Sequence, residues 1–382
     1  MTISKLFDEI DILYPKYLDV LEDVAKIESP SRYKKGVDAV GNYFIEMAKV
    51  RGWAVEVLTE KTSGNAICIT LNPDAKAAPV ALSGHIDTVH PVGLFKEPLV
   101  RRDENNMYGP GVLDCKGGVV AAFLCMDALD RCGFRKRPVM LIIQSDEEIS
   151  SIFSDKRTVK FMCDKAKDAI AFLNLEPAQA DSAVIARKGI IRFEFTVHGK
   201  AGHSSKCFEA ANAVTEAAHK IIELEKMKSE NGLTCNCGVI NGGTVANSVA
   251  DTCIFTADIR FATQEQLEEA KETIKKVSEC NVIAGCSSDV KEVSFRPAME
   301  KTEINLKLLD KINKINEEIG LPHLAANTSL GGADTAYTTI AGIPCVDSLG
   351  VQGKFQHSVN EYIIMNTLAS SAKQQAAIAL MI

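Results

Sequence analysis

The sequence has no excess of positive charge, because 43 Lys and Arg residues stand against 50 Asp and Glu residues and the formal net charge is −7. Binding to the phosphates of a nucleic acid requires a basic face, and no cluster of Lys and Arg residues supplies one. The sequence also has no uninterrupted apolar run long enough to cross a bilayer, and residues 1–9 become charged before the apolar core of a signal peptide could form. We therefore expect a cytoplasmic protein with no nucleic-acid partner and no membrane partner.

A repeated CxxC spacing is also missing, although the chain has 12 cysteines. They are scattered through expected helices and strands, so we interpret them as small buried apolar side chains or unpaired thiols in a reducing compartment. Cys235 and Cys237 lie two residues apart in an expected strand, where packing is a more common role than metal binding or redox chemistry. The sequence shows no internal repeat and no low-complexity segment.

The length and the order of apolar segments indicate two domains. The 382 residues, of which 46% are hydrophobic and 24% charged, are too many for one ordinary core. Apolar strands at 66–70, 80–82, 139–143 and 170–175 alternate with helical patterns, which predicts an α/β domain with a mostly parallel sheet and helices on both faces. Ligands of such sheets bind at the carboxyl ends of the strands.

From about 188 to 298 the pattern changes to strand, helix, strand, strand, helix, strand, which is the order of a ferredoxin-like α+β unit. The chain then returns to a helix, a strand, a glycine-rich loop and a last helix. We therefore expect a discontinuous domain, 1–187 and 299–382, interrupted by an inserted domain, 188–298.

Polar residues follow the expected strands of the first domain. His85 and Asp87 come directly after the apolar run 79–82, and residues two apart on an extended chain project from the same face. A metal-bound imidazole usually passes its second N–H to a carboxylate, and Asp87 is placed to accept it. A solvated turn is the commoner origin of a single His-x-Asp sequence.

Further clusters supply carboxylates and a second imidazole. Asp114 is the one carboxylate of a glycine-rich loop, where a charge at the start of the next helix is the commoner role. Glu147 and Glu148 end a buried strand, so one can bind a metal while the other moves protons, although a solvated acidic loop is commoner. Glu176 also ends an apolar strand, and His357 lies far along the chain.

Together these clusters supply two histidines and three carboxylates at strand ends of one domain. Two divalent metals about 3.5 to 4 Å apart need a shared carboxylate plus a histidine and an acid on each side, which matches this set. Mixed histidine and carboxylate ligands suit zinc best, with manganese or cobalt as alternatives. The sequence therefore predicts a site for two metal ions.

Seven motifs occur in order between about residues 80 and 361: Gly84-His85-x-Asp87-Thr88-Val89, Gly109-x-Gly111-x-x-Asp114-x-Lys116-Gly117-Gly118, Asp146-Glu147-Glu148, Glu176-Pro177, Gly202-His203-Ser204-Ser205, Asp258-Ile259-Arg260 and His357-Ser358-x-x-Glu361. In these motifs the chain resembles the zinc-dependent exopeptidase and amidohydrolase family of glutamate carboxypeptidase, acetylornithine deacetylase, succinyl-diaminopimelate desuccinylase and peptidase T. Tyr108-Gly109-Pro110-Gly111 and Ala186-Arg187-Lys188-Gly189 are most similar to the glutamate carboxypeptidase branch.

The resemblance implies a catalytic domain that binds two Zn²⁺ ions per subunit. Asp114 would bridge the two ions. His85 and Glu176 would complete the first site. Glu148 and His357 would complete the second site.

The same resemblance implies the roles of two more acids. Asp87 would orient His85 without touching a metal. Glu147 would act as the general base, taking a proton from the water that bridges the ions and passing it to the leaving amine. The ions would lower the pKa of this water toward neutrality and polarise the scissile carbonyl.

The inserted domain would then serve as a lid and as the interface of a homodimer. His203 would reach the active site of the partner subunit and stabilise the developing oxyanion. Arg260 and Asn247 would hold the terminal carboxylate of the substrate, and Gly332 belongs to a loop that would line the substrate. On the residues alone, an exposed turn histidine and a solvated edge arginine are the commoner interpretations.

The expected activity is hydrolysis of a peptide or amide bond next to a free carboxylate, as a carboxypeptidase or dipeptidase. The alternative is an N-acyl amino acid deacylase with the same metals, and a non-catalytic relative is a third candidate. The chain departs from the family at 150–154, which replaces the usual Gly-Ser-x-Gly, and at 206–208, which lacks the usual Pro. These departures affect the specificity pocket and remove no expected ligand.

Overall fold

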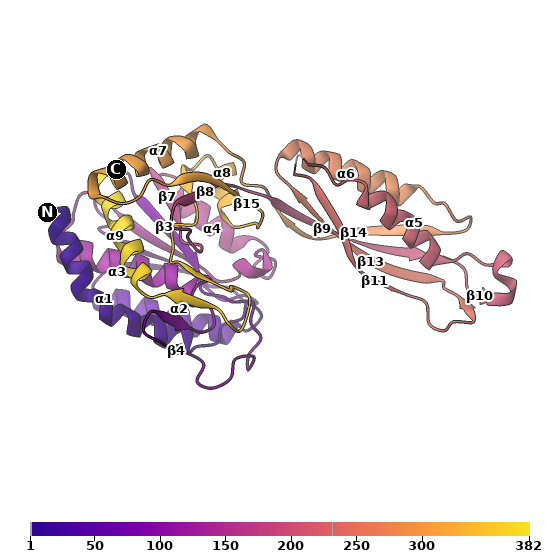
Figure 1. Cartoon of the computed structure of the whole chain (residues 1–382), viewed down its shortest axis with the longest axis horizontal. Helices are drawn as coiled ribbons and strands as arrows, with labels where there is room; N and C mark the ends of the chain where they lie inside the picture. Colours follow the sequence, from indigo (N-terminus) through magenta and orange to yellow (C-terminus); the bar gives the residue numbers. More distant parts are fainter. Residues whose placement is uncertain (1, 231) are drawn as a thin grey trace. The chain divides into compact units, whose positions relative to one another are not determined.

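This computed structural model describes residues 2–230 and 232–382. These residues form two separate hydrophobic cores. Unit 1 comprises the residues up to Ile185 together with Lys301–Thr328 and Tyr337–Ile382, and unit 2 comprises Ala186–Glu300 and Ser329–Ala336 (Figure 1). The two main junctions, after Ile185 and after Glu300, lie two residues from the boundaries expected from the sequence. The stretch Ser329–Ala336 differs from the expectation, which assigns it to the first domain.

Backbone contacts explain why this stretch belongs to unit 2. The N–H of Lys188 donates to the carbonyl of Ser329 at 3.1 Å. Gly332 lies so close to Ile190 and Arg296 that a Cβ atom on it would be 2.9 Å from Arg296 Cδ. These contacts join segments that are far apart in the sequence, so no local sequence pattern predicts them.

The central sheet of unit 1 is mixed. Within the described residues it has six strands in the order β1-β2-β6-β3-β7-β16. Their bounds are β1 (Ala54–Leu58), β2 (Ala66–Leu71), β3 (Val80–His85), β6 (Val139–Gln144), β7 (Ala171–Asn174) and β16 (Cys345–Val346). Strand β3 runs parallel to β6 and β7, and β7 runs parallel to β16, but β2 runs antiparallel to β1 and β6. The α/β class is confirmed, and three of the five neighbouring strand pairs are parallel, as expected for a mostly parallel sheet. Strand β2 is the exception, because the short connection 59–65 allows only an antiparallel pair with β1.

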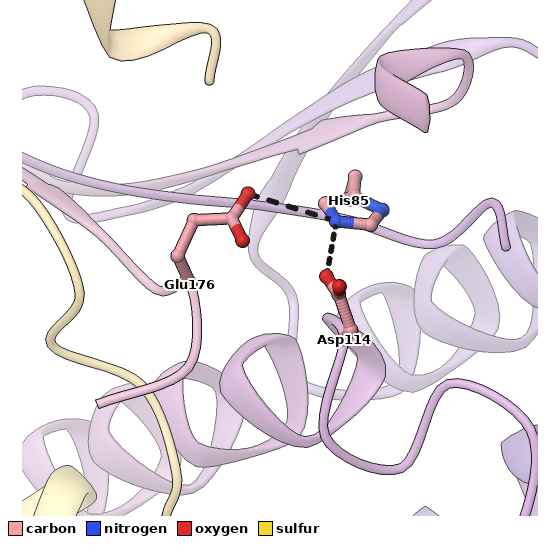
Figure 2. A group of neighbouring side chains, drawn as sticks. All are labelled: His85, Asp114 and Glu176. Atoms are coloured by element: carbon pink, nitrogen blue, oxygen red, sulfur yellow. Dashed lines mark hydrogen bonds and ion pairs between the residues drawn. The ribbon is translucent and has the colours of Figure 1, made fainter. Parts of the chain in front are cut away.

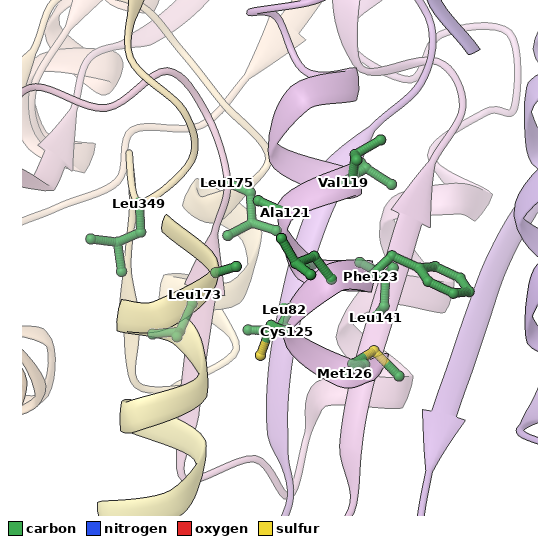
Figure 3. Packing of buried hydrophobic residues seen from close by; sticks show 14 of the residues in the cluster. Leu82, Val119, Ala121, Phe123, Cys125, Met126, Leu141, Leu173, Leu175 and Leu349 are labelled. Carbon is green, nitrogen blue, oxygen red and sulfur yellow. The ribbon is translucent and has the colours of Figure 1, made fainter. Parts of the chain in front are cut away.

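Helices cover both faces of this sheet. The helices are α1 (Ile3–Ala25), α2 (Lys34–Val50), α3 (Lys116–Arg131), α4 (Arg157–Ala166), α7 (Glu303–Ile319) and α9 (Asn366–Met381). A short helix, α8 (Thr335–Ile340), begins in unit 2 and ends in unit 1. Helix α3 packs on the face that carries Leu82 and Leu141 (Figure 3). Ser83 projects to the opposite face, where its hydroxyl lies 3.7 Å from the sulfur of Met162 on α4. Because α1 and α9 contact the outer side of α3, this helix is buried over nearly its whole length.

Short strands and 3₁₀ turns position the remaining loops of unit 1. Strands β4 (Arg101–Arg102), β5 (Asn106–Tyr108), β17 (Gly353–Lys354) and β18 (Tyr362–Ile364) form a small sheet in the order β17-β18-β5-β4. Strand β8 (Ser182–Arg187) pairs with β15 (Ala325–Ser329), and the 3₁₀ turn η1 (Glu147–Ile149) follows β6. The small sheet matters for the site, since it joins the loop before β18 to the loop after β5.

Unit 2 has the predicted strand, helix, strand, strand, helix, strand order. The elements are β9 (Gly189–His198), α5 (Ala213–Glu225), β11 (Thr234–Gly242), β13 (Thr252–Phe261), α6 (Gln264–Glu279) and β14 (Ser287–Arg296). They form an antiparallel sheet in the order β11-β13-β9-β14. Phe193 and Phe195 of β9 point into the core under α5 and α6, as the alternating pattern predicts. A loop between β9 and α5 adds β10 (Gly202–His203) and the 3₁₀ turn η2 (Ser204–Glu209), and β12 (Ser248–Val249) pairs with β10.

Two expectations from composition concern the whole chain. Among residues 2–230 and 232–382, no helix is both long enough and apolar enough to cross a membrane. All 12 cysteines lie in this part of the chain and are free thiols, as expected.

Candidate metal centre

His85 ends β3 with both ring nitrogens in contact with acidic residues. Its Nε2 lies 3.0 Å from Oδ1 of Asp114 and 3.7 Å from Oε1 of Glu176 (Figure 2). Its Nδ1 lies 3.0 Å from the backbone carbonyl of Asp87 and 3.4 Å from Oδ1 of the same residue. The Nδ1 side therefore fixes the ring, and Nε2 faces the two other carboxylates.

Asp114 also contacts a second group. Its Oδ2 lies 3.2 Å from Nε2 of His357, and this nitrogen lies 3.4 Å from Oε2 of Glu148. Two sets with ligand atoms no more than 4.8 Å apart result, and Asp114 is a member of both. We call His85, Asp114, Glu148, Glu176 and His357 the ligand cluster.

The topology of the sheet explains this convergence. The parallel strands β6, β3 and β7 are neighbours, so their carboxyl ends meet at one edge. His85 is the last residue of β3, Glu148 lies in η1 after β6, and Glu176 lies two residues beyond β7. These three residues therefore meet although long stretches of chain separate them.

The small sheet positions the other two residues of the ligand cluster. Tyr362 of β18 pairs with Tyr108 of β5, which sets the loop that carries His357 against the loop that carries Asp114. Glu361 fixes the contact: its Oε1 accepts the backbone N–H groups of Leu113 at 2.8 Å and of Asp114 at 3.0 Å.

Glu361 is a supporting residue to which the sequence analysis gave no role. It is 1% exposed, and its Oε2 lies 3.0 Å from Nε2 of His90 and accepts the N–H of Gly111 at 3.3 Å. A buried carboxylate with this many donors holds a backbone in place. The sequence feature that could have indicated this role is the position of Glu361 four residues after His357, within the same motif.

Asp87 connects the end of β3 to η1. Its Oδ1 accepts the N–H of Glu147 and its Oδ2 accepts the N–H of Glu148, both at 3.1 Å. Its Oδ2 also accepts the hydroxyl of Ser31 at 2.6 Å. Asp87 thus restrains His85 and the backbone of both glutamates at once, which is more than the orienting role expected from the sequence.

The electrostatics of the ligand cluster reflect burial and close charges. Burial, with smaller contributions from the charges of Asp114 and Glu147, raises the pKa of Glu148 to about 8. Hydrogen bonds with Asp114 and Glu148 raise the pKa of His357 to about 10. Burial opposes ionisation of Asp114, yet hydrogen bonds with His357 and His85 hold its pKa below the usual value.

The donor set fits divalent metal ions. Three carboxylates share a largely buried space with two imidazoles. Nitrogen and oxygen donors in this ratio are the usual ligands of zinc and related ions. One carboxylate with an oxygen toward each set is the arrangement that a two-metal site needs.

The remaining predicted residues lie in unit 2. His203 is exposed on β10, with Nδ1 2.8 Å from the hydroxyl of Ser205. Asn247 is also exposed. It lies near His203, because its backbone carbonyl accepts the N–H of Ser204 at 3.0 Å. Arg260, on β13, donates from Nε to Asp258 at 2.7 Å. The structure thus brings His203 and Asn247 together within unit 2, and the roles of these residues and of Gly332 remain predictions.

Comparison with known proteins also indicates a metal-dependent hydrolase family. The profile of Peptidase family M20/M25/M40 matches residues 81–380. Carboxypeptidase G2 of Pseudomonas sp. (strain RS-16) is 26% identical over 363 residues, which cover 93% of this chain and 86% of that protein. Succinyl-diaminopimelate desuccinylase of Wolbachia pipientis wMel is 24% identical over 314 residues, which cover 76% of this chain and 75% of that enzyme.

Among solved structures, a dinuclear metal-binding peptidase from Bacillus subtilis has a similar fold. Its TM-score is 0.70 at 14% identity, and the match covers 97% of this chain and 98% of that chain.

Proposed function

Because the chain belongs to peptidase family M20/M25/M40, a family of metal-dependent peptidases and amidohydrolases, we propose that it cleaves a peptide or amide bond next to a free carboxylate with the help of two metal ions. It would act as a carboxypeptidase or dipeptidase on small peptides. The observation that carries this proposal is the membership of Asp114 in both sets of ligand atoms.

The ligand cluster would hold the two ions. His85 and Glu176 would bind one ion, Glu148 and His357 would bind the other, and Asp114 would contact both. Zinc suits these donors best, and manganese or cobalt can replace it. When bound, the ions would polarise the scissile carbonyl and make water a better nucleophile near neutral pH.

The chain's own residues would carry the proton transfer. Glu147 lies next to Glu148 on η1, is 6% exposed, and has its backbone N–H held by Asp87 at 3.1 Å. A carboxylate on a backbone held in this way can take a proton from the attacking water and deliver it to the leaving amine. Asp87 would keep the His85 ring in one orientation through the Nδ1 side.

Unit 2 would supply the other contacts to the substrate. Arg260 presents a guanidinium group that matches a carboxylate, and its partner Asp258 fixes the orientation of that group. Asn247 and Gly332 would contribute to the same end of the substrate. His203 would stabilise the oxyanion in the site of a partner subunit, and unit 2 would form the interface of a homodimer. These four assignments rest on the family resemblance.

A second candidate function is deacylation of N-acyl amino acids. The similarity to the succinyl-diaminopimelate desuccinylase of Wolbachia favours it, because removal of a succinyl group breaks the same kind of amide bond. The ligand cluster serves both reactions equally well, so the choice depends on the pocket around it.

A substrate panel tests the proposal. Zinc-loaded protein is assayed against short peptides with acidic or neutral C-terminal residues, the same peptides with an amidated C-terminus, and N-acetyl amino acids. We expect cleavage of the free peptides and loss of cleavage on amidation. Activity on N-acetyl amino acids alone would favour the second candidate, and protein that binds no divalent ion and stays inert with zinc or manganese would indicate a non-catalytic relative.

A further inference from the structure

A cavity of about 470 Å³ in unit 1 borders the ligand cluster at Glu148. Its apolar lining comes from the loop after β3, which supplies Val89 and Val92, and from Ile149 of η1. Arg32 and Tyr33 line it from the loop before α2. The cavity therefore combines an apolar surface, one cationic side chain and one member of the ligand cluster.

The backbone of this cavity is held in place by hydrogen bonds. The N–H of Thr88 donates to the carbonyl of Ser29 at 2.9 Å, and the N–H of Ser31 donates to the carbonyl of Thr88 at 3.2 Å. The N–H of Tyr33 donates to the carbonyl of Pro30 at 2.7 Å, which closes a turn around Arg32. The two loops that form the cavity are thus tied together.

Arg32 is the cation of this loop that has no acidic partner. In the part of the chain that the structure describes, no Asp or Glu pairs with its guanidinium group, whereas the neighbouring Lys34 binds Asp38 at 2.9 Å. The guanidinium carbon lies 5.1 Å from the centre of the Phe153 ring. Stacking on a ring limits the motion of the guanidinium group and leaves its N–H edge available for an anion.

Glu148 lines the cavity, and its carboxylate contacts His357 in the ligand cluster. Its side chain is 8% exposed, and its Oε2 lies 3.4 Å from Nε2 of His357 inside the ligand cluster. Val89 and Val92, by contrast, are 37% and 56% exposed, so a ligand that covers them gains from burial of apolar surface. A side chain with an aliphatic stem and a carboxylate end matches these surroundings.

We propose that this cavity receives the side chain of the residue on the acyl side of the scissile bond, and that Arg32 selects an acidic side chain there. The proposal rests on the proposed function, in which Arg260 holds the terminal carboxylate on the other side of that bond. Arg32 is then a specificity-determining residue that takes no part in the chemical step.

The test compares N-acetyl-Glu-X with N-acetyl-Gln-X, where X is the same C-terminal residue that the enzyme releases fastest. The two substrates have nearly the same shape and differ in charge. We expect the wild-type enzyme to have a kcat/KM about tenfold higher for the Glu substrate, which is the low end for a hydrogen bond between charged groups. In Arg32→Gln the ratio should fall to about one, with the Gln substrate hydrolysed within about twofold of the wild-type rate.

Lys35→Gln is the matched control, because Lys35 is exposed in the first turn of α2 and does not line the cavity. This variant should keep the preference for Glu. Metal content and thermal midpoint are measured for all three proteins, so that a folding defect is recognised.

Equal rates of the wild-type enzyme on both substrates, or a preference that survives in Arg32→Gln, would overturn the role of Arg32 while leaving the proposed function intact. Absence of hydrolysis of any peptide by metal-loaded wild-type enzyme would overturn the proposed function itself, and this inference with it.

Discussion

Each unit of the molecule buries a group of charged side chains, and the two groups are balanced in different ways. In unit 2, Lys220 of α5 is 2% exposed and lies 3.3 Å from Glu216, which is fully buried. The Lys220 ammonium also donates to the carbonyls of Val277 and Cys280 at 2.8 and 2.7 Å. The second oxygen of Glu216 accepts the N–H of Ile283 at 2.7 Å.

The group in unit 2 therefore balances its charges within the chain, one cation against one anion. The ligand cluster in unit 1 instead gathers three carboxylates and two imidazoles, and the imidazoles are neutral when they bind a metal. Buried charge that the chain neutralises itself is expected to stabilise or fix the fold, whereas buried charge in excess of one sign is expected to bind something of the other sign. We therefore expect the group in unit 2 to support the fold and the ligand cluster to bind cations.

Metal removal should have the largest effect. Chelation should abolish hydrolysis, and added zinc should restore it, because the carboxylates of the ligand cluster lose the cations that balance them. A ligand at a hundred to a thousand times its dissociation constant stabilises the folded state by about 3 to 4 kcal/mol, so the thermal midpoint of unit 1 should fall as well. Calorimetry with and without chelator measures this shift. Full activity of thoroughly chelated protein would contradict the expectation that the ligand cluster binds metal ions.

Glu147→Gln should lower kcat by about a thousandfold and leave the metal content unchanged, because it removes a general base and keeps every member of the ligand cluster. Steady-state kinetics and elemental analysis of the same preparation measure both quantities. Glu46→Gln on α2, where the side chain is 69% exposed, is the control. Normal turnover of the Glu147 variant would rule out its role as the base.

Lys220→Met should lower the free energy of unfolding by about 3 to 5 kcal/mol, because it leaves the carboxylate of Glu216 buried without its partner. Folded molecules of this variant should keep the wild-type metal content, which denaturant unfolding and metal analysis test together. The control is Lys226→Met, whose side chain is 64% exposed and whose pair with Glu223 should contribute at most about 1 kcal/mol. A loss of metal with unchanged stability would reverse the assignment of the two groups.

Ser150→Gly should have the smallest effect. Ser150 follows η1 with a φ of +56°, a conformation that glycine adopts without the steric cost of a side chain. We expect a gain in stability of up to about 1 kcal/mol, with no change in metal content, since the residue lies outside the ligand cluster. Ser370→Gly on the exposed side of α9 should instead lose about that amount. A destabilised Ser150 variant would mean that the serine makes a compensating contact.

The sequence predicted the fold best where the signal is local. The apolar run before His85 is a buried strand, Val80–His85, and the alternation at 190–198 is the half-exposed strand β9. The resemblance to the zinc exopeptidase family is confirmed by the family match. The prediction of a mostly parallel sheet does not hold for β2, which is antiparallel to both of its neighbours, because strand direction depends on which neighbour a strand pairs with and not on its own residues.

The supporting residues were the least predictable part of the site. Nothing in the sequence distinguishes the role of Glu361 from that of other acidic residues, or the role of Arg32 from that of other basic residues. Only the fold places the Glu361 carboxylate against the backbone N–H of Asp114, and only the fold lines a cavity with Arg32 beside Glu148. Such roles depend on contacts between distant segments.

The sequence by itself determined which chemistry is available: two imidazoles, three carboxylates and an adjacent glutamate, each at the end of an apolar segment or in a glycine-rich loop. Side-chain type and strand periodicity are local properties, so they are readable along the chain. The tertiary structure decided that Asp114 has one oxygen toward each half of the ligand cluster, because that depends on the register of β18 against β5 and on the neighbouring ends of β3, β6 and β7.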